Sequence, residues 1–292
     1  MSVKLFFMKL AAKKGRRDCV KYAKSVGAPT GERFMVPREG KKPVEVYIYR
    51  PEKSGALPCV FNVHGGAWVG NDALYLDTQS RLMAKRLGAV VVNINYTKAD
   101  VKPFPYQQYE VTDTVKYFIR SAARFNVDVD RLAIMGYSAG GHLCAAAGQI
   151  LNREGVKLSA QVLCYPFLDF TFGGGDELAK LLAPVFFKEL PADDPICSPG
   201  AETAENLRGM APVIIVSCGT DDLRHQAAEY IEKLREAGVP VEELFYEKAI
   251  HGYLETNYPE TKEYPAKNPE QETIMHETER DIAERLTKIW TC

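Results

Sequence analysis

The sequence has no long apolar run and no excess of charge of either sign. The apolar stretch near the start, between Lys4 and Lys9, spans only four residues, too few for the core of a signal peptide. Lys and Arg total 37 against 38 Asp and Glu, so no strong field attracts nucleic acid or an anionic membrane. We therefore expect a cytoplasmic protein with neither a nucleic-acid nor a membrane partner.

The sequence also lacks any C-x-x-C pair and any low-complexity tract. Three of its seven cysteines, Cys59, Cys164 and Cys218, lie in apolar strand-like runs, where we expect buried thiols rather than disulfides or zinc ligands. We accordingly expect no metal and no cofactor. With 46% hydrophobic and 26% charged residues, the 292-residue chain has the composition of one large folded domain with an added cap.

Short β-branched runs alternate along the chain with longer amphipathic stretches. This alternation predicts an α/β fold with a mostly parallel sheet flanked by helices. The expected strands cover residues 44–49, 58–64, 89–95, 132–136, 160–165, 212–218 and 242–247. The expected helices cover residues 74–87, 107–125, 140–152 and 225–237, with a last helix that Asn268 caps and Pro269 opens.

Two regions fit this alternation poorly. Residues 1–43 are therefore interpreted as an N-terminal cap segment, and residues 44–292 as the catalytic domain. A second irregular region at about 167–210 is rich in aromatic residues, Gly and Pro, and we interpret it as a cap insertion.

The run Gly136-Tyr137-Ser138-Ala139-Gly140 lies where an expected strand meets an expected helix. Such a turn forces its central residue into a strained conformation and needs small flanking residues for close approach of the neighbouring backbone. It raises that residue above the carboxyl end of the sheet, over the positive end of a helix. Ser138 is therefore the candidate nucleophile. The five-residue pattern alone would be weak evidence, and its position makes it informative.

A second loop follows the expected strand that ends at His64. Acyl transfer generates an oxyanion, which backbone amides without side-chain obstruction stabilise. Gly65 and Gly66 are the candidate donors, together with the amide of Ala139. We interpret His64 as a residue that orients this loop, because it precedes the nucleophile and adjoins the two glycines.

A serine nucleophile needs a histidine base and a carboxylate that orients the histidine. In this type of fold, the chain order is serine, acid, histidine. His251 fits this order, in a short loop after an expected strand. Asp221 and Asp222 both follow the preceding strand; we choose Asp221 as the acid and expect Asp222 to cap the next helix.

Taken together, these motifs resemble the hormone-sensitive-lipase-like branch of the α/β-hydrolases, which includes bacterial acetyl esterases. The resemblance rests on the ordered runs His64-Gly65-Gly66, GYSAGGHL, Gly219-Thr220-Asp221-Asp222-Leu223 and His251-Gly252-Tyr253. It implies that Ser138, Asp221 and His251 form the triad. Three positions depart from the branch: Ala67 replaces a third glycine, Tyr137 replaces an acid before the serine, and Asp222 replaces a proline after the acid.

Aromatic residues in the segments that border the site indicate a compact apolar pocket. We expect the substrate to be a small or medium acyl ester, with acetyl favoured over long lipid chains, and an acyl-enzyme intermediate. The candidate pocket residues are Trp68, Tyr137, Phe167, Phe172 and Tyr253, with Phe186 and Phe187 in the same segments.

Two other functions remain open at this point. The same triad would serve an amidase such as an aryl formamidase. A non-catalytic ligand-binding protein similar to the plant gibberellin receptors is the third hypothesis, although those receptors lack the catalytic histidine that is present here. The sequence leaves the oligomeric state open, with a homodimer among the options.

Overall fold

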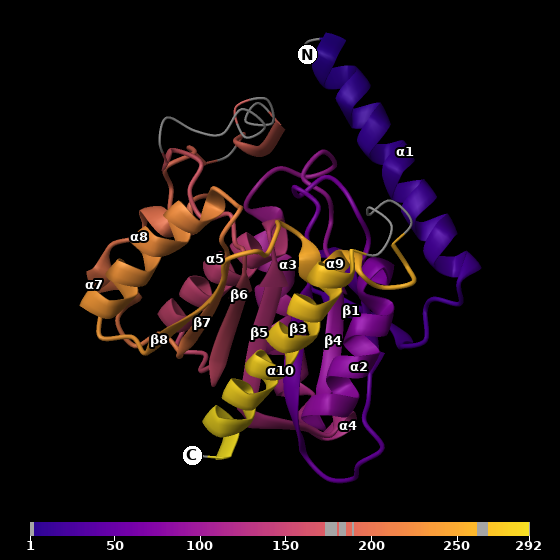
Figure 1. Ribbon diagram of the computed structural model, residues 1–292, viewed down its shortest axis with the longest axis vertical. Coiled ribbons are helices and arrows are strands. Elements are labelled where there is room, and N and C mark those ends of the chain that lie inside the picture. The colour runs from indigo at the N-terminus through magenta and orange to yellow at the C-terminus, as the bar shows by residue number, and fades with distance from the viewer. Residues whose placement is uncertain (1–2, 173–179, 181–184, 189, 262–267, 292) are drawn as a thin grey trace.

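A computed structural model describes residues 3–172, 180, 185–188, 190–261 and 268–291 of the chain (Figure 1). Its centre is an eight-stranded sheet in the order β1-β2-β4-β3-β5-β6-β7-β8. The pairs β1/β2 and β2/β4 are antiparallel, and the other neighbours are parallel. The strands are β1 (Glu32–Arg38), β2 (Lys41–Tyr49), β3 (Leu57–Val63), β4 (Val90–Asn95), β5 (Val127–Tyr137), β6 (Ala160–Cys164), β7 (Val213–Cys218) and β8 (Val241–Tyr246). The predicted fold class is thus confirmed.

Three of the inner strands are buried along their whole length. Every residue of β3, β6 and β7 is buried, as expected of parallel strands that are covered on both faces. Their cysteines, Cys59, Cys164 and Cys218, are likewise buried. The sheet therefore forms a rigid support whose carboxyl edge carries the loops discussed below.

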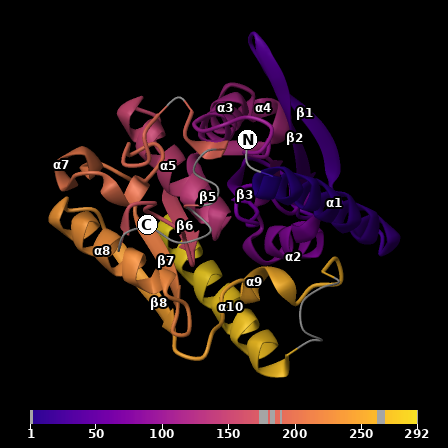
Figure 2. The ribbon, with the colours of Figure 1, turned by 90° about the horizontal axis from the view of Figure 1, so that it is seen from above.

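Helices cover both faces of the sheet (Figure 2). One core packs α3, α5 and α8 against one face, and a second core packs α2 and α10 against the other. The helices are α1 (Val3–Ser25), η1 (Ala73–Leu76), α2 (Asp77–Leu87), α3 (Tyr106–Arg120), α4 (Ala122–Phe125), α5 (Ala139–Arg153), η3 (Pro199–Ala201), α7 (Ala204–Leu207), α8 (Leu223–Glu236), α9 (Tyr253–Thr256) and α10 (Pro269–Thr291). Asn268 does cap α10, since its side chain accepts from the amide of Glu270 at 3.1 Å.

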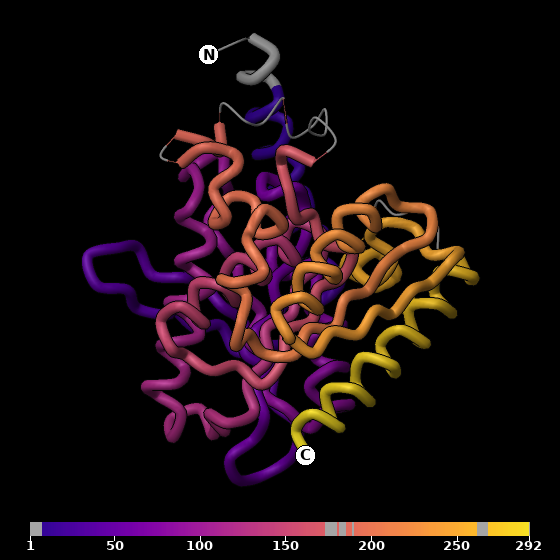
Figure 3. The backbone as a smooth tube through the Cα atoms, turned by 90° about the vertical axis from the view of Figure 1, so that its left-hand side faces the viewer, coloured from indigo at the N-terminus to yellow at the C-terminus, as the bar shows by residue number. Residues whose placement is uncertain are grey.

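The predicted N-terminal cap segment contains α1, β1 and the first residues of β2. Residues 32–38 form β1, an edge strand of the sheet, which the sequence pattern does not indicate. Helix α1 lies over the upper edge of the molecule, at the opposite end from the last turns of α10 (Figure 3). Arg16 ties α1 to the body through the Asp100 carboxylate, at 3.0 and 3.1 Å. No helix among the described residues is both long and apolar enough to cross a membrane.

The predicted cap insertion at about 167–210 is described in part. Residues 173–179, 181–184 and 189 lie outside the described residues. Within the remainder, Phe186 is fully buried and its carbonyl accepts from the amide of Phe104 at 3.0 Å. This segment therefore packs on the domain next to the carboxyl edge of the sheet.

Candidate active site

Ser138 occupies a tight turn between β5 and α5. Its φ of 49° and ψ of −115° lie in a sparsely populated region of backbone space. The Ser138 amide donates to Cys164 O at 2.9 Å, which fixes the turn against β6. An added Cβ at Gly140 would overlap the Val63 carbonyl, so only glycine lets α5 approach β3 this closely.

Ser138, His251 and Asp221 form one hydrogen-bonded chain. The Asp221 carboxylate lies 2.5 Å from His251 Nδ1, and His251 Nε2 lies 2.9 Å from Ser138 Oγ. Because a carboxylate can only accept, Nδ1 carries the proton and Nε2 is left to accept from the serine hydroxyl. The His251 side chain is 41% exposed whereas that of Asp221 is 10% exposed, so the ring is open to a substrate and its orienting acid is shielded.

The structure distinguishes the two candidate acids. The second carboxylate oxygen of Asp221 accepts from the amide of Leu223 at 3.0 Å, which holds the side chain in place. Asp222 lines the cavity described below, and the partner of His251 Nδ1 is Asp221. The expectation that its side chain caps α8 is wrong: Asp222 stands at the N-cap position but makes no capping hydrogen bond there, and Asp221 takes the Leu223 amide instead.

His64 is buried under the loop that follows β3. Its Nδ1–H donates to Gly65 O at 2.6 Å, and its Nε2 accepts from Lys98 Nζ at 2.9 Å. Burial, together with the neighbouring Lys98 charge, lowers the pKa of His64 well below its usual value, so the ring is neutral. Burial also lowers the pKa of Lys98, to about 8. These contacts suit a residue that orients the loop.

The amide of Gly65 is already engaged. It donates to the Glu255 carboxylate at 2.8 Å, so the expectation that Gly65 supplies an oxyanion donor is wrong. Gly66 and Ala67 line the same cavity as Ser138, and in the described part of the chain no partner is found for their amides. The amide of Ala139 opens α5, where first-turn amides have no intrahelical acceptor.

A cavity of about 730 Å³ opens above Ser138 and His251. Two of the five predicted pocket residues, Trp68 and Phe167, line it. Trp68 is only 3% exposed and packs against a cluster of rings, with centroids 5.0 to 6.0 Å away. The cluster consists of Phe104, His142, Phe167, Phe170 and Phe186.

His142 fixes Trp68 in this cluster. Trp68 Nε1–H donates to His142 Nδ1 at 3.1 Å, and His142 Nε2–H donates to Cys197 O at 2.7 Å. Burial lowers the pKa of His142 to about 4, which keeps the ring neutral and able to play both roles. The wall formed by Trp68 is therefore rigid.

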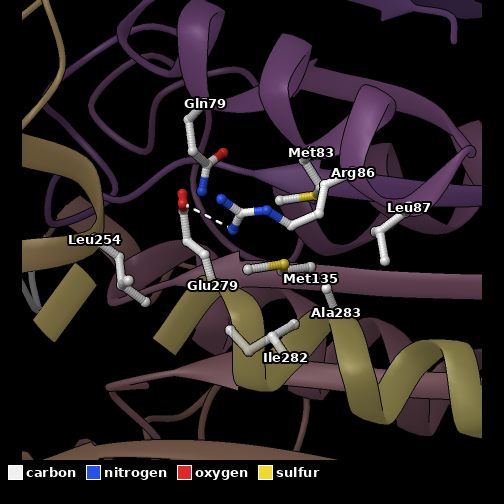
Figure 4. A pocket seen from close by; sticks show the side chains of 9 residues that line it. All are labelled: Gln79, Met83, Arg86, Leu87, Met135, Leu254, Glu279, Ile282 and Ala283. Atoms are coloured by element: carbon white, nitrogen blue, oxygen red, sulfur yellow. Dashed lines mark hydrogen bonds and ion pairs between the residues drawn. The ribbon is translucent and has the colours of Figure 1, made fainter. Parts of the chain in front are cut away.

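Tyr137 does not line the cavity, which corrects the prediction. Its side chain is fully buried on the opposite side of β5, where Gln79 donates to its hydroxyl. Figure 4 shows Gln79 with Met135 around a separate small cavity, of about 20 Å³, between α2, β5 and α10. Side chains alternate along a strand, so the residue before an exposed nucleophile points into the core.

Tyr253 is also wrong as a pocket residue. Tyr253 is fully buried, and its hydroxyl lies 2.7 Å from Thr278 Oγ1 of α10. Phe172 is not among the residues that line the cavity.

Glu255 is a site residue that the sequence motifs do not indicate. Its side chain is buried, lines the cavity and binds the Gly65 amide. Burial raises the pKa of Glu255 to about 7. The available signal was an acidic residue four positions after His251, directly after Gly252-Tyr253-Leu254.

The sequence matches the α/β-hydrolase fold family over residues 60–255. The chain belongs to that family. The hormone-sensitive-lipase-like branch indicated by its motifs is thereby confirmed. The chain is 29% identical to an arylesterase of Saccharolobus solfataricus over 241 residues, 77% of this chain and 78% of the relative.

Two further proteins are similar to this α/β-hydrolase over most of its length. An arylacetamide deacetylase of Oryctolagus cuniculus is 29% identical over 290 residues, 74% of this chain and 73% of the relative. The solved structure of a hyperthermophilic esterase from Pyrobaculum calidifontis superimposes with a TM-score of 0.82, at 24% identity, and covers 97% of this chain and 94% of that chain. The structural likeness concerns the fold.

Proposed function

We propose that this chain is a serine carboxylesterase that hydrolyses small or medium acyl esters, acetyl esters above all, through an acyl-enzyme. Its place among carboxylic ester hydrolases follows from its relatives. The observation that carries the serine mechanism is the hydrogen-bonded chain from Ser138 through His251 to Asp221.

In the proposed reaction, Ser138 Oγ attacks the ester carbonyl carbon while His251 Nε2 takes the serine proton. The imidazolium then returns this proton to the departing alkoxide as the carbon–oxygen bond breaks. A water molecule, deprotonated by His251, then attacks the acyl carbon. The bond between Ser138 Oγ and the acyl carbon breaks, His251 returns the proton to Ser138 Oγ, and the carboxylic acid is released. Amides of Gly66, Ala67 and Ala139 are the proposed donors to the oxyanion of both tetrahedral intermediates.

The preference for short acyl groups rests on the wall that Trp68 forms. Its ring is held by Phe167 and by the hydrogen bond to His142, so the cavity cannot widen on this side without disturbing packed rings. A series of 4-nitrophenyl esters from acetate to octanoate tests this. We expect kcat/KM to be highest for acetate or butyrate, and to fall at least about tenfold for octanoate, which is about 1.4 kcal/mol of transition-state stabilisation. Highest activity on octanoate would contradict the proposal.

Ser138→Ala is the control for the mechanism. The variant should fold as the wild type does and lose turnover, and a fluorophosphonate should label the wild type on Ser138 but leave the variant unlabelled. Without an adduct on the wild-type protein, the ligand-binding hypothesis would be the better one.

An amidase is the second candidate, because an arylacetamide deacetylase is among the relatives. The same three residues would cleave an amide if His251 protonates the departing amine. Rates for 4-nitrophenyl acetate, 4-nitroacetanilide and an aryl formamide, compared at one pH, discriminate the two functions. An ester hydrolase should favour the nitrophenyl ester by far more than the difference in intrinsic reactivity.

A further inference from the structure

Glu255 places a buried carboxylate beside the loop that follows β3. The side chain lies on α9 and is only 5% exposed. One of its oxygens accepts from the Gly65 amide at 2.8 Å, and the other lies 3.4 Å from the hydroxyl of Tyr165. No cation contacts it among the described residues, and burial of a carboxylate on two neutral donors costs free energy. Such a cost is typical of a group retained for function.

The carboxylate fixes one of two peptide groups that meet at Gly65. Glu255 holds the N–H of Gly65, and His64 Nδ1–H holds its carbonyl oxygen at 2.6 Å. In a trans peptide the C=O and the following N–H point in opposite directions. With the Gly65 carbonyl turned to the His64 ring, the amide of Gly66 must point away from that ring. Both backbone dihedrals of Gly65 are thereby set by side chains.

The packing around Gly65 leaves little freedom. An added Cβ at this position would lie 2.8 and 2.9 Å from the two oxygens of Glu255, and 3.1 Å from the carbonyl oxygen of Tyr137. The carboxylate therefore packs directly against the loop, which cannot move toward it. Without that side chain the loop would lose both a hydrogen bond and a contact surface.

The short stretch from His251 to Glu255 also carries the catalytic base. Gly252 lies between His251 and α9, and its carbonyl accepts from the Glu255 amide at 2.9 Å. The ring of Tyr165 packs against His251, with centroids 5.0 Å apart, while its hydroxyl faces Glu255. The position of the base and that of the oxyanion loop are thus set by one short stretch of chain.

We propose that Glu255 is a positioning residue for the oxyanion hole, whose carboxylate oxygen holds the Gly65 amide so that the amide of Gly66 faces Ser138. This inference rests on the proposed ester hydrolysis. The role requires a hydrogen-bond acceptor of the right length, so a glutamine, which keeps a carbonyl oxygen at the same place, should fill it. An alanine should not.

Steady-state kinetics on 4-nitrophenyl acetate tests the proposal with Glu255→Ala and Glu255→Gln. An oxyanion donor acts on the transition state, so we expect kcat of the alanine variant to fall about 10- to 100-fold with KM within about threefold of the wild type. The inhibition constant of a trifluoromethyl ketone, which forms a tetrahedral adduct on Ser138, should rise by a similar factor. The glutamine variant should stay within about threefold of the wild type in each measurement.

Glu260→Ala is the matched control. Glu260 is also a buried glutamate, 4% exposed, and it accepts from the amide and the hydroxyl of Thr78 at 3.2 and 2.6 Å, outside the catalytic cavity. Its removal should lower the melting temperature but leave kcat unchanged. A wild-type kcat or ketone affinity in Glu255→Ala would overturn the proposal, as would a glutamine variant as impaired as the alanine variant.

Amide hydrogen exchange keeps this test separate from the proposed function. In the protein without substrate, peptides over residues 60–70 should exchange faster in Glu255→Ala than in the wild type or in Glu255→Gln. Equal exchange in all three proteins would overturn the positioning role whatever the activity. A wild-type protein that cleaves no ester, yet shows this exchange pattern, would refute the proposed function and leave the loop contact intact.

Discussion

At the scale of single residues, the two neighbouring carboxylates after β7 have different surroundings. Asp221 accepts hydrogen bonds from His251 and from the Leu223 amide, whereas Asp222 lines the cavity. We predict that Asp221→Asn lowers kcat by about 10⁴-fold, because the amide favours the wrong tautomer of the histidine. Asp222→Asn should retain kcat within about threefold and change mainly KM. Parallel assays on one ester check this, and a larger loss of kcat in Asp222→Asn would assign the acid to that residue.

Glu255 also makes the stability of the protein depend on pH. Its pKa is raised from 4.5 to about 7 by burial, while the Gly65 amide, His251 and the Tyr165 hydroxyl oppose the shift. Between these two values the folded protein binds a proton that the unfolded chain has released, so this group's contribution to stability falls as the pH rises through that window. Above about pH 7 the contribution no longer changes. The loss amounts to about 3 kcal/mol at most.

Glu255→Gln removes this titration. Its free energy of unfolding, relative to the wild type, should therefore improve between about pH 4.5 and 7 and stay level above that range. Urea unfolding at pH 5, 6, 7 and 8 measures the difference. Parallel pH profiles for the two proteins would contradict the assignment of a raised pKa to this carboxyl.

At the scale of elements, the close approach of α5 to β3 depends on Gly140. An added methyl group there would overlap the carbonyl of Val63 and lie 2.6 Å from that of His64, so the helix would have to move. We predict that Gly140→Ala costs about 3 kcal/mol of unfolding free energy and displaces the oxyanion loop. Gly15→Ala is the control, because nothing lies within 4 Å of its added Cβ in α1, and it should not destabilise. Equal midpoints of urea unfolding in the two variants would refute this packing argument.

The same elements explain how far the sequence alone could predict the site. His251, which follows β8, is identified by its order in the chain. Strands β3, β5 and β7 have apolar runs, and each ends in a motif with a recognisable chemical role, so these strands and the loops that follow them were predictable from the sequence. Strand β1 was not, because ERFMVPR carries charges at both ends, contains a proline and is buried at only two positions. The contact of Glu255 with Gly65 joins residues 190 positions apart. No local sequence pattern indicates a contact of this kind. Because the sequence does not show that the Gly65 amide already has a partner, Gly65 was expected to donate to the oxyanion.

In the complete fold, helix α1 of the N-terminal region borders the active site. A cleft of about 670 Å³ runs beneath it, and Asn71 and Tyr75 line both this cleft and the catalytic cavity. The space above Ser138 therefore continues under α1. We predict that the alcohol group of a large ester extends into this space, whereas that of a small ester does not reach it.

Arg16 holds α1 over this cleft. Its guanidinium donates to both oxygens of Asp100 and to the carbonyl of Val69, next to Trp68 in the loop after β3. Arg16→Ala leaves Asp100, whose side chain is 8% exposed, without its cation. We predict a rise in KM of about three- to tenfold for an ester with a bulky alcohol, equivalent to roughly 1 kcal/mol, with kcat/KM for 4-nitrophenyl acetate unchanged.

Hydrogen exchange over residues 8–25 should be faster in Arg16→Ala, because the helix loses its part-buried anchor to the body. Lys13→Ala is the matched control: this cation is exposed, lies one turn away on the same helix, and its removal leaves the Asp100 contact in place. That variant should keep wild-type KM for both esters. If Arg16→Ala changed KM equally for the small and the bulky ester, α1 would act on the catalytic loop itself; if it changed neither, the space under α1 would not take part in substrate binding.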